Sequence, residues 1–266
     1  MQPRAVGAAR LSVCGDAMGK TRLQVLRQSG SLKLVFPQTH RTDAEVVLVN
    51  TAGGITGGDR FSLDINVQDG AKLTLTTQAA ERAYRAQPGE IGSVQTKLTV
   101  ADGGCLNWLP QELILYDRCA LRRRLEISLG PAARLLMVEP LVFGRAAMPE
   151  RLEDIFFQDR ITIWQAGKPL YIDGIDLGGD AAAHLARRAL ANGAGALASV
   201  VMVAPDVESY LPKLRALLPA TAGASLLRPG VLVIRQLATE GFALRRALIP
   251  MLEHLSNHIL PTSWRL

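Results

Sequence analysis

The sequence is poor in aromatic residues and histidines, and each shortage argues against a class of protein. Phe, Trp and Tyr make up 5% of the 266 residues. Nucleic-acid binders usually combine stacking aromatic side chains with clustered basic residues, so this composition argues against them. The four histidines, at positions 40, 184, 254 and 258, belong to no H-E-x-x-H or H-x-E…P-C-x-x-C arrangement, and no G-x-S-x-G is present. The sequence therefore indicates neither a catalytic nucleophile nor a catalytic zinc site.

Cysteines and long apolar runs are also scarce. Cys14, Cys105 and Cys119 are an odd number at wide spacings without a C-x-x-C pair, which argues against a disulfide framework and a zinc clip. No apolar run approaches the ~18 residues of a membrane span, and no secretory signal of 7–15 apolar residues follows the first basic residues. We expect a cytoplasmic protein with no membrane association.

The formal net charge of +6 comes mostly from arginine. The arginines are dispersed apart from Arg122, Arg123 and Arg124, which lie in the alternating segment LRRRLEISL. Dispersed arginine favours protein surfaces over nucleic acid, because the guanidinium fork pairs with carboxylates. Two of the three clustered arginines should share one side of a strand, most simply a solvated face.

A period-two pattern dominates residues 31–176, with turn signals at intervals of roughly a dozen residues. This predicts a mainly β fold, a large antiparallel or helical-type β sandwich, with a β-rich part over residues 31–177. A mixed α/β part with a few helices should follow over residues 178–266. Because the composition does not break sharply, we expect a single domain over residues 1–266.

Three helices are expected in the C-terminal part. Asp180 should cap an alanine-rich helix that runs to about Asn192. Asp206 should cap a second helix. The third should open at Thr239 and continue past Pro250, which should kink it or mark a join.

Two glycine pairs follow the apolar residues 46–49, at Gly53, Gly54, Gly57 and Gly58. Ile55 stands where a dinucleotide-binding loop needs its second glycine, and Asp59 stands where a P-loop has lysine. An acidic side chain there would repel phosphate. A structural loop between strands is therefore the favoured interpretation.

Several acidic residues lie in apolar or glycine-rich surroundings: Asp59, Glu81, Glu112, Asp117 and Glu139. Most should be paired with cations or face solvent. If several line one cavity, their carboxylates could hold or pass a divalent cation weakly. Cross-strand hydrogen bonds alone would account for the neighbouring Thr77 and Gln78.

His254 and His258 are four residues apart on the last expected helix, so both imidazoles could reach one ion. Two ligands do not make a metal site, and ordinary histidines near a helix C-terminus explain them as well. They remain weak metal candidates.

Four ordered segments carry a family resemblance: LVNTAGGITGGD, LTLTTQAAERAYR, LPQELILYD and VEPLVFGRAAMPE. Their order and spacing resemble the urease accessory protein UreD family, called UreH in some species. The similarity begins near Ser31, runs through the FQDR and YIDG segments and continues more loosely to the C-terminus. It therefore covers most of the chain.

The resemblance implies a maturation factor that is not an enzyme. Proteins of this family bind UreF directly and the GTPase UreG through UreF, and they engage apo-urease so that nickel reaches a dinuclear centre bridged by a carbamylated lysine. The resemblance also implies an internal path for Ni²⁺, bound transiently, with no tightly held cofactor. Oxygen ligands suit transfer because they bind nickel less tightly than imidazole or thiolate sets.

The resemblance also assigns candidate residues. The glycine-loop motif comprises Asn50, Gly53, Gly54, Gly57, Gly58 and Asp59. Candidates for a nickel path or a partner contact are Thr77, Gln78, Arg85, Glu112, Asp117, Glu139 and Arg145. The alternative is a β-rich ligand-binding protein or hydrolase, which would require a pocket that unites carboxylates and, for the hydrolase, measurable turnover.

Overall fold

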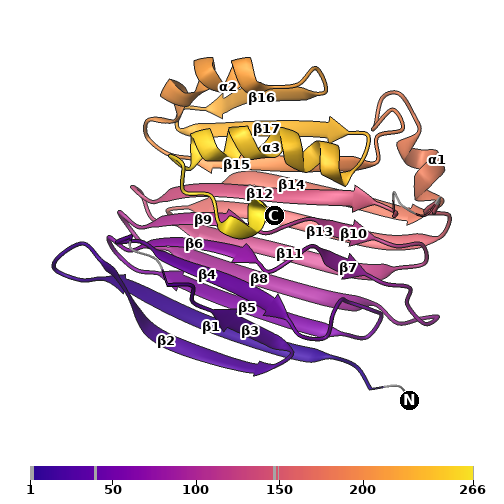
Figure 1. Ribbon diagram of the computed structural model, residues 1–266, viewed down its shortest axis with the longest axis horizontal. Helices are drawn as coiled ribbons and strands as arrows, with labels where there is room; N and C mark the ends of the chain where they lie inside the picture. Colours follow the sequence, from indigo (N-terminus) through magenta and orange to yellow (C-terminus); the bar gives the residue numbers. More distant parts are fainter. Residues whose placement is uncertain (1–2, 39–40, 146–147, 149, 266) are drawn as a thin grey trace.

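The computed structural model describes residues 3–38, 41–145, 148 and 150–265. Two large β-sheets form most of the molecule, and helices from the C-terminal part lie against one of them (Figure 1). Within the segment VEPLVFGRAAMPE, Ala146, Ala147 and Pro149 lie outside the described residues. The mainly β prediction is confirmed.

The first sheet has seven strands and one solvent-facing side. In order across the sheet these are β14 (Lys168–Gly179), β13 (Ile155–Gln165), β11 (Ala120–Leu129), β8 (Gly92–Val100), β5 (Arg60–Val67), β1 (Val6–Gly15) and β2 (Thr21–Gly30). Strands β1 and β2 precede Ser31, where the period-two pattern was expected to begin. Buried and accessible residues alternate along β5 and β11, because one face of this sheet packs inward and the other meets water.

The second sheet has ten strands. Its main path is β16 (Ala222–Arg228), β17 (Val231–Ala238), β15 (Ala196–Val203), β12 (Arg134–Phe143), β9 (Cys105–Leu109), β6 (Lys72–Thr77), β4 (Ala44–Asn50) and β3 (Leu32–Val35). Beside this path, β10 (Leu113–Leu115) pairs with β12 and β7 (Glu81–Ala83) pairs with β10. Eight consecutive residues of β12 are buried, as expected for a strand covered on both faces.

The chain passes repeatedly from one sheet to the other, which gives a solenoid-like arrangement. Strands β5, β8 and β11 lie in the first sheet, whereas β6, β9 and β12, which follow them in the sequence, lie in the second. Neighbours within each sheet are therefore parallel along its centre, as in the β5·β8 and β6·β9 pairs. The antiparallel expectation was wrong for these strands. It holds at both ends of the first sheet, as in β13·β14, and from β12 through β15 and β17 to β16 in the second.

The main hydrophobic core lies between the two sheets. Inward side chains of the first sheet, including Leu11, Ile65 and Ile127, share it with Leu75 and Met137 of the second sheet. Each of these side chains is fully or almost fully buried. Burying such side chains contributes about 1.5–3 kcal/mol apiece, so this layer dominates the stability of the fold.

The C-terminal helices cover the outer face of the ten-stranded sheet. These are α2 (Leu211–Leu217), which follows the 3-10 turn η1 (Val207–Tyr210), and α3 (Gly241–Leu255). Helix α3 contacts β12, β15 and β17 (Figure 1). Its buried residues Leu244, Leu248 and Met251 recur at helical spacing and form a second core with Val200 and other residues of the sheet.

The expected helices form with changed boundaries. Helix α1 (Ala181–Leu185) is capped by Asp180, whose carboxylate accepts a hydrogen bond from Ala183 N, but it ends well before Asn192. Asp206 makes no side-chain capping hydrogen bond, and Glu240 rather than Thr239 caps α3. Pro250 lies inside α3, which continues to Leu255. A high alanine content favours a helix locally, but turns after Leu185 end it early.

Candidate functional site

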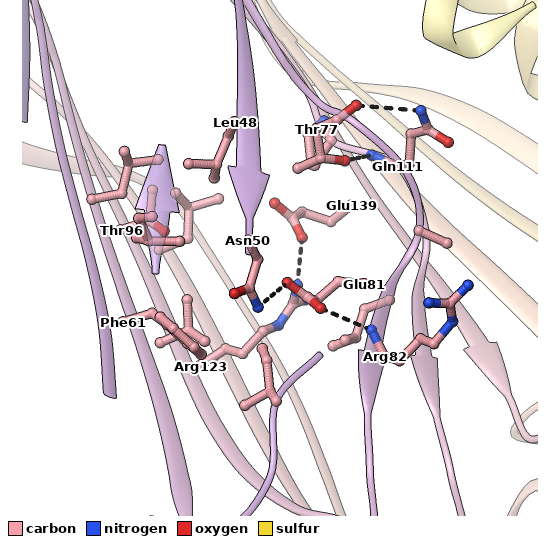
Figure 2. A pocket seen from close by; sticks show the side chains of 18 of the residues that line it. Leu48, Asn50, Phe61, Thr77, Glu81, Arg82, Thr96, Gln111, Arg123 and Glu139 are labelled. Atoms are coloured by element: carbon pink, nitrogen blue, oxygen red, sulfur yellow. Dashed lines mark hydrogen bonds and ion pairs between the residues drawn. The ribbon is translucent and has the colours of Figure 1, made fainter. Parts of the chain in front are cut away.

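A cavity of about 260 Å³ lies between the two sheets (Figure 2). Side chains from the seven-stranded sheet, such as Phe61 and Thr96, form one wall, and side chains from the ten-stranded sheet, such as Leu48 and Trp108, form the opposite wall. The cavity therefore lies in the layer between the sheets that the main core fills elsewhere. Most of its wall is apolar, and a small group of polar side chains reaches into it.

A buried ion cluster joins the two walls. The Arg123 guanidinium contacts Glu139 Oε2 at 3.1 Å through Nη1 and Asp159 Oδ2 at 2.5 Å through Nη2. Asp159 is the direct neighbour of Arg123 on the adjacent strand, whereas Glu139 comes from the other sheet. Trp108 Nε1–H donates a 2.6 Å hydrogen bond to Glu139 Oε1. Both carboxyl groups are thus fixed in position.

Glu81 supplies a third carboxylate to the cavity. Its Oε2 accepts a 3.0 Å hydrogen bond from Asn50 Nδ2, and its Oε1 accepts one of 3.1 Å from Arg82 N. The same Asn50 amide also donates to Gly54 O at 3.0 Å, which links Glu81 to the glycine loop. Burial raises the pKa of Glu81 because a charged carboxylate loses hydration there.

The interior of the cavity carries an excess of carboxylates. Three acidic side chains line it, Glu81, Glu139 and Asp159, beside the buried guanidinium of Arg123. The other two lining arginines, Arg82 and Arg124, are exposed, and Arg124 pairs with Glu126 on the outer face of the sheet. Burial also raises the pKa of Glu139, as expected where negative charge is incompletely neutralised.

The cluster leaves net negative charge in the cavity. With all three carboxylates ionised, the cluster with Arg123 has a formal charge of −2, so one divalent cation would bring it to neutrality. Oxygen donors from carboxylates, amides and hydroxyls hold such ions less tightly than imidazole or thiolate donors. Among the described residues, no group of three or more His, Cys, Asp or Glu is arranged to hold a metal. The three carboxylates therefore do not form a preformed set of metal ligands.

Polar residues at the end of β6 form a second part of the wall. Gln111 N–H donates to Thr77 Oγ1 at 2.9 Å, and Thr77 Oγ1–H donates to Ala79 O at 3.1 Å. The Gln111 amide donates to Thr77 O, to Gln78 O and to Ser263 O at distances of 3.1–3.3 Å. The cavity wall is thereby connected to the C-terminal segment.

The glycine loop connects β4 to β5 and packs against the strand segment that follows β6. Ile55 N donates to Arg82 O and Tyr84 N donates to Ile55 O, so the loop lies beside β7. A Cβ added at Gly54 would lie 2.2 Å from a carbon of the Tyr84 ring, which explains the need for glycine there. Asn50 and Gly53 line the cavity.

Asp59 has a structural role within this loop. It is 4% exposed, and its carboxylate accepts hydrogen bonds from Ala5 N at 2.7 Å and Thr56 N at 2.8 Å. It does not line the cavity, in contrast to the expectation of a possible path residue at this position. Its two oxygens fix the start of β5 against the N-terminal segment.

Glu112 is also held by another residue. Arg245 of α3 contacts both of its carboxylate oxygens, through Nε at 2.9 Å and Nη2 at 2.6 Å. Arg245 also donates to Gln111 Oε1 and lies over the Trp264 ring. The pair therefore anchors α3 and the C-terminal segment to the sheet, and it lies outside the cavity lining.

Three further candidates lie away from the cavity. Asp117 accepts hydrogen bonds from Glu153 N and Asp154 N. It lines a second pocket together with Arg85. Arg145 pairs with Glu150 at 3.0 Å and lies over the Tyr116 ring. Of the path residues expected from the resemblance, the cavity brings together Thr77, Gln78 and Glu139.

His254 and His258 do not lie on the same helix. Helix α3 ends at Leu255, and Asn257 and His258 then adopt positive φ angles in the turn that follows. His254 Nε2 lies 3.2 Å from Tyr210 O, so this nitrogen already has a partner in the fold. The expectation of a continuous helix through His258 was wrong, because the chain turns to bring Trp264 against the sheet.

Arg123 and Asp159 were not identified as site residues from the sequence. Both occupy core-facing positions of their strands, where Leu121 and Leu125 flank Arg123 and Phe157 and Ile161 flank Asp159. The prediction that two of the three clustered arginines share a solvated strand face is confirmed for Arg122 and Arg124, whereas Arg123 lies on the other face of the strand. A charged residue at the inward position of an alternating strand is the signal that could have found them.

Comparisons with known proteins show which family the sequence matches. Residues 5–265 match the family model described as UreD urease accessory protein. The chain is 53% identical over 242 residues to the urease accessory protein UreD of Ruegeria pomeroyi, which covers 91% of this chain and 94% of the relative. It is 49% identical over 265 residues to that of Roseobacter denitrificans, covering 100% and 96%.

A more distant relative extends the similarity beyond these two. The urease accessory protein UreD of Sinorhizobium medicae is 41% identical over 269 residues, covering 99% of this chain and 96% of its own. Within the described residues, no helix is long and apolar enough to cross a membrane. The match over nearly the whole length, which includes both the glycine loop and the strands that carry the buried ion cluster, makes the chain a member of the UreD urease accessory protein family.

Proposed function

We propose that this protein assists the insertion of nickel into urease and that Ni²⁺ passes through the cavity between its two sheets. The observation that carries the proposal is the placement of Glu81, Glu139 and Asp159 around one internal space with the partly buried guanidinium of Arg123. In this role the protein binds UreF directly, UreG through UreF, and apo-urease. It carries out no catalytic step itself.

The chemistry of the cavity suits transfer better than storage. Buried carboxylates attract a divalent cation, since the interior otherwise carries unneutralised negative charge. Each carboxylate also has hydrogen-bond donors from the protein, Trp108 for Glu139 and Asn50 for Glu81, so the cation competes with existing contacts. This competition keeps the affinity of the cavity for the cation moderate and allows the cation to leave the cavity again.

The wall residues extend the path beyond the carboxylates. Thr77 and Gln78 lie where β6 ends, and their oxygens can coordinate the ion. Gln111 holds the surrounding backbone through its hydrogen bonds. All of these donors are oxygens, which bind nickel reversibly. The proposed path therefore runs from the region of Thr77 to the ion cluster around Glu139.

The test uses cells that carry a complete urease operon from which this gene has been deleted. The gene is restored as wild type or as Glu81→Gln with Glu139→Gln, and urease activity and nickel content are measured. Gln keeps the shape of each side chain but removes its charge, which makes it preferable to changes at Asp59 or Glu112, where hydrogen bonds and Arg245 hold the fold together.

We expect deletion to leave urease without nickel, wild type to restore it, and the double variant to restore at most about a tenth of the nickel content. Glu126→Gln, on the exposed face of β11, is the matched control and should behave as wild type. The double variant should still co-purify with its partners. Full nickel loading with the double variant would contradict a path through this cavity.

A further inference from the structure

Arg123 has an unusual position for an arginine. Its guanidinium lies between the two sheets, and its side chain is 17% exposed. The side chains of Glu139 and Asp159, which it contacts, are 7% and 5% exposed. Asp159 and Glu139 come from different sheets, so the guanidinium bridges the walls of the cavity. Figure 2 shows it reaching into the space that Glu81 and Asn50 also face.

The guanidinium occupies oxygens that a metal ion would use. Nη1 contacts Glu139 Oε2, and the other oxygen of Glu139 already accepts the Trp108 N–H. Nη2 contacts Asp159 Oδ2. A cation that binds Glu139 and Asp159 must therefore displace at least one of these contacts, because two positive groups cannot share the same oxygens closely.

The Arg123 side chain can also move towards another carboxylate in the cavity. Its Nε is buried and has no hydrogen-bond partner, so its ion pairs are made by the two terminal nitrogens, and its Cζ lies 5.8 Å from the centre of the Phe157 ring. Glu81 lines the same cavity and offers a third carboxylate. A long, flexible side chain with one uncommitted donor can shift between carboxylates without a change in the backbone.

We propose that Arg123 is a displaceable counter-cation, which competes with Ni²⁺ for Glu139 and Asp159 and so makes binding in the cavity weak and release fast. This inference rests on the proposed function and assigns Arg123 a positioning role in it. When the cavity is empty, the guanidinium neutralises the two carboxylates. When Ni²⁺ arrives, the guanidinium yields these oxygens, and its return helps the ion to leave.

Removal of the positive charge of Arg123 should strengthen Ni²⁺ binding and slow Ni²⁺ release. Arg123→Gln and wild type are purified with their partner proteins, and Ni²⁺ binding is measured by calorimetry. Release is measured as the rate of transfer to a chromophoric chelator. We expect Arg123→Gln to bind Ni²⁺ about tenfold more tightly and to release it about tenfold more slowly.

Two controls define the effect. Arg122→Gln removes a neighbouring exposed arginine that does not line the cavity and should leave affinity and release unchanged. Arg123→Lys keeps the positive charge and should lie closer to wild type than Arg123→Gln. An Arg123→Gln protein that is folded and binds Ni²⁺ no more tightly than wild type would overturn the inference.

Arg123→Gln leaves two buried carboxylates without their cation and could fail to fold. In that case the comparison uses Asp159→Leu and Arg123→Met with Asp159→Leu, which differ only at position 123. Replacing a buried ion pair by apolar residues of similar size is often neutral for stability. Glu139 then loses Arg123 but keeps its hydrogen bond from Trp108. The double variant, Arg123→Met with Asp159→Leu, should bind Ni²⁺ about tenfold more tightly than Asp159→Leu alone. Equal affinities of the two proteins would overturn the inference.

The same measurements separate the two proposals. If wild type binds Ni²⁺ and Glu139→Gln abolishes binding while the Arg123 variants change nothing, the path stands and the counter-cation role is wrong. If neither Glu81→Gln nor Glu139→Gln alters Ni²⁺ binding, the path through the cavity is itself wrong.

Discussion

At the scale of single residues, Gly54 determines how the glycine loop packs on the neighbouring segment. An added Cβ would lie 2.2 Å from the Tyr84 ring and 2.9 Å from Arg82 O. The ring could move, but the backbone carbonyl could not move without breaking the hydrogen bond from Ile55 N. We therefore expect Gly54→Ala to lower the free energy of unfolding by about 3 kcal/mol, measured by urea denaturation.

Gly53 is the matched control for this prediction. It has a φ of +78° and no atom within 4 Å of an added Cβ, so Gly53→Ala meets strain in the backbone only. Its cost should be about 1 kcal/mol. Equal costs for the two variants would show that contact with Tyr84 and Arg82 does not explain the glycine at position 54.

Glu81 gives a prediction about pH. Burial raises its pKa in the folded protein above the ordinary value of 4.5, so between these two values the folded state binds more protons than the unfolded state. Stability linked to this group is then full below about pH 4.5 and is lost as the pH rises through the raised pKa. Glu81→Gln removes this loss and should be more stable than wild type at about pH 7.5.

The measurement is urea denaturation of wild type and Glu81→Gln without metal over a series of pH values. The difference in the free energy of unfolding should be largest near neutral pH and shrink towards pH 4.5. Glu126→Gln should show no such trend, since that side chain lies on the exposed face of β11. A difference that stays constant with pH would contradict the raised pKa.

Residue identity alone could predict part of the site. Thr77, Gln78, Glu139 and the start of the glycine loop were found through the family motifs, and all of them line the cavity. Asp59 and Glu112 belong to the same motifs but have structural partners, Thr56 N and Arg245. A motif shows which residues the fold requires, but only the three-dimensional contacts separate those that hold the loop from those that face the cavity.

At the scale of structural elements, the C-terminal segment is held by Trp264. Its side chain is fully buried in the second core, and its Nε1–H donates a 2.9 Å hydrogen bond to Leu109 O of β9. Trp264→Ala should destabilise the protein by about 3–5 kcal/mol, because it removes a large buried side chain and leaves Leu109 O without its donor. Urea denaturation measures the change.

Phe242 on α3 supplies the control, since it is 71% exposed despite its apolar side chain. Phe242→Ala should change the free energy of unfolding by no more than about 0.5 kcal/mol. If Trp264→Ala costs as little as Phe242→Ala, the C-terminal segment contributes little to the second core.

The strands were predicted more successfully than their pairing. Period-two alternation identifies a strand with one buried face, and it does so equally for parallel and antiparallel neighbours. The direction of pairing depends on which sheet the next strand joins, as when β5 is followed by β6 in the opposite sheet. That choice is made by contacts between distant segments, so local pattern could not decide between a meander and a solenoid-like path.

At the scale of the whole molecule, the solenoid-like winding places a cavity where the two sheets face each other. Arg123, Glu139 and Asp159 come from three strands, β11, β12 and β13, which are consecutive in the chain but divided between the sheets. This division lets one guanidinium bridge both walls. Whether the chain behaves as a single domain over residues 1–266 stays a prediction.

If nickel passes through the cavity, a large side chain that fills the cavity should block its delivery to urease. Thr96 of β8 lines the cavity, whereas Thr99 points to the opposite side of the same strand. The measurement is the nickel content of urease from cells in which this protein is replaced by Thr96→Phe or Thr99→Phe. Both variants should still co-purify with their partners. We predict nickel-poor urease with Thr96→Phe and normal nickel with Thr99→Phe, whereas full nickel loading with a folded, partner-bound Thr96→Phe protein would contradict the path.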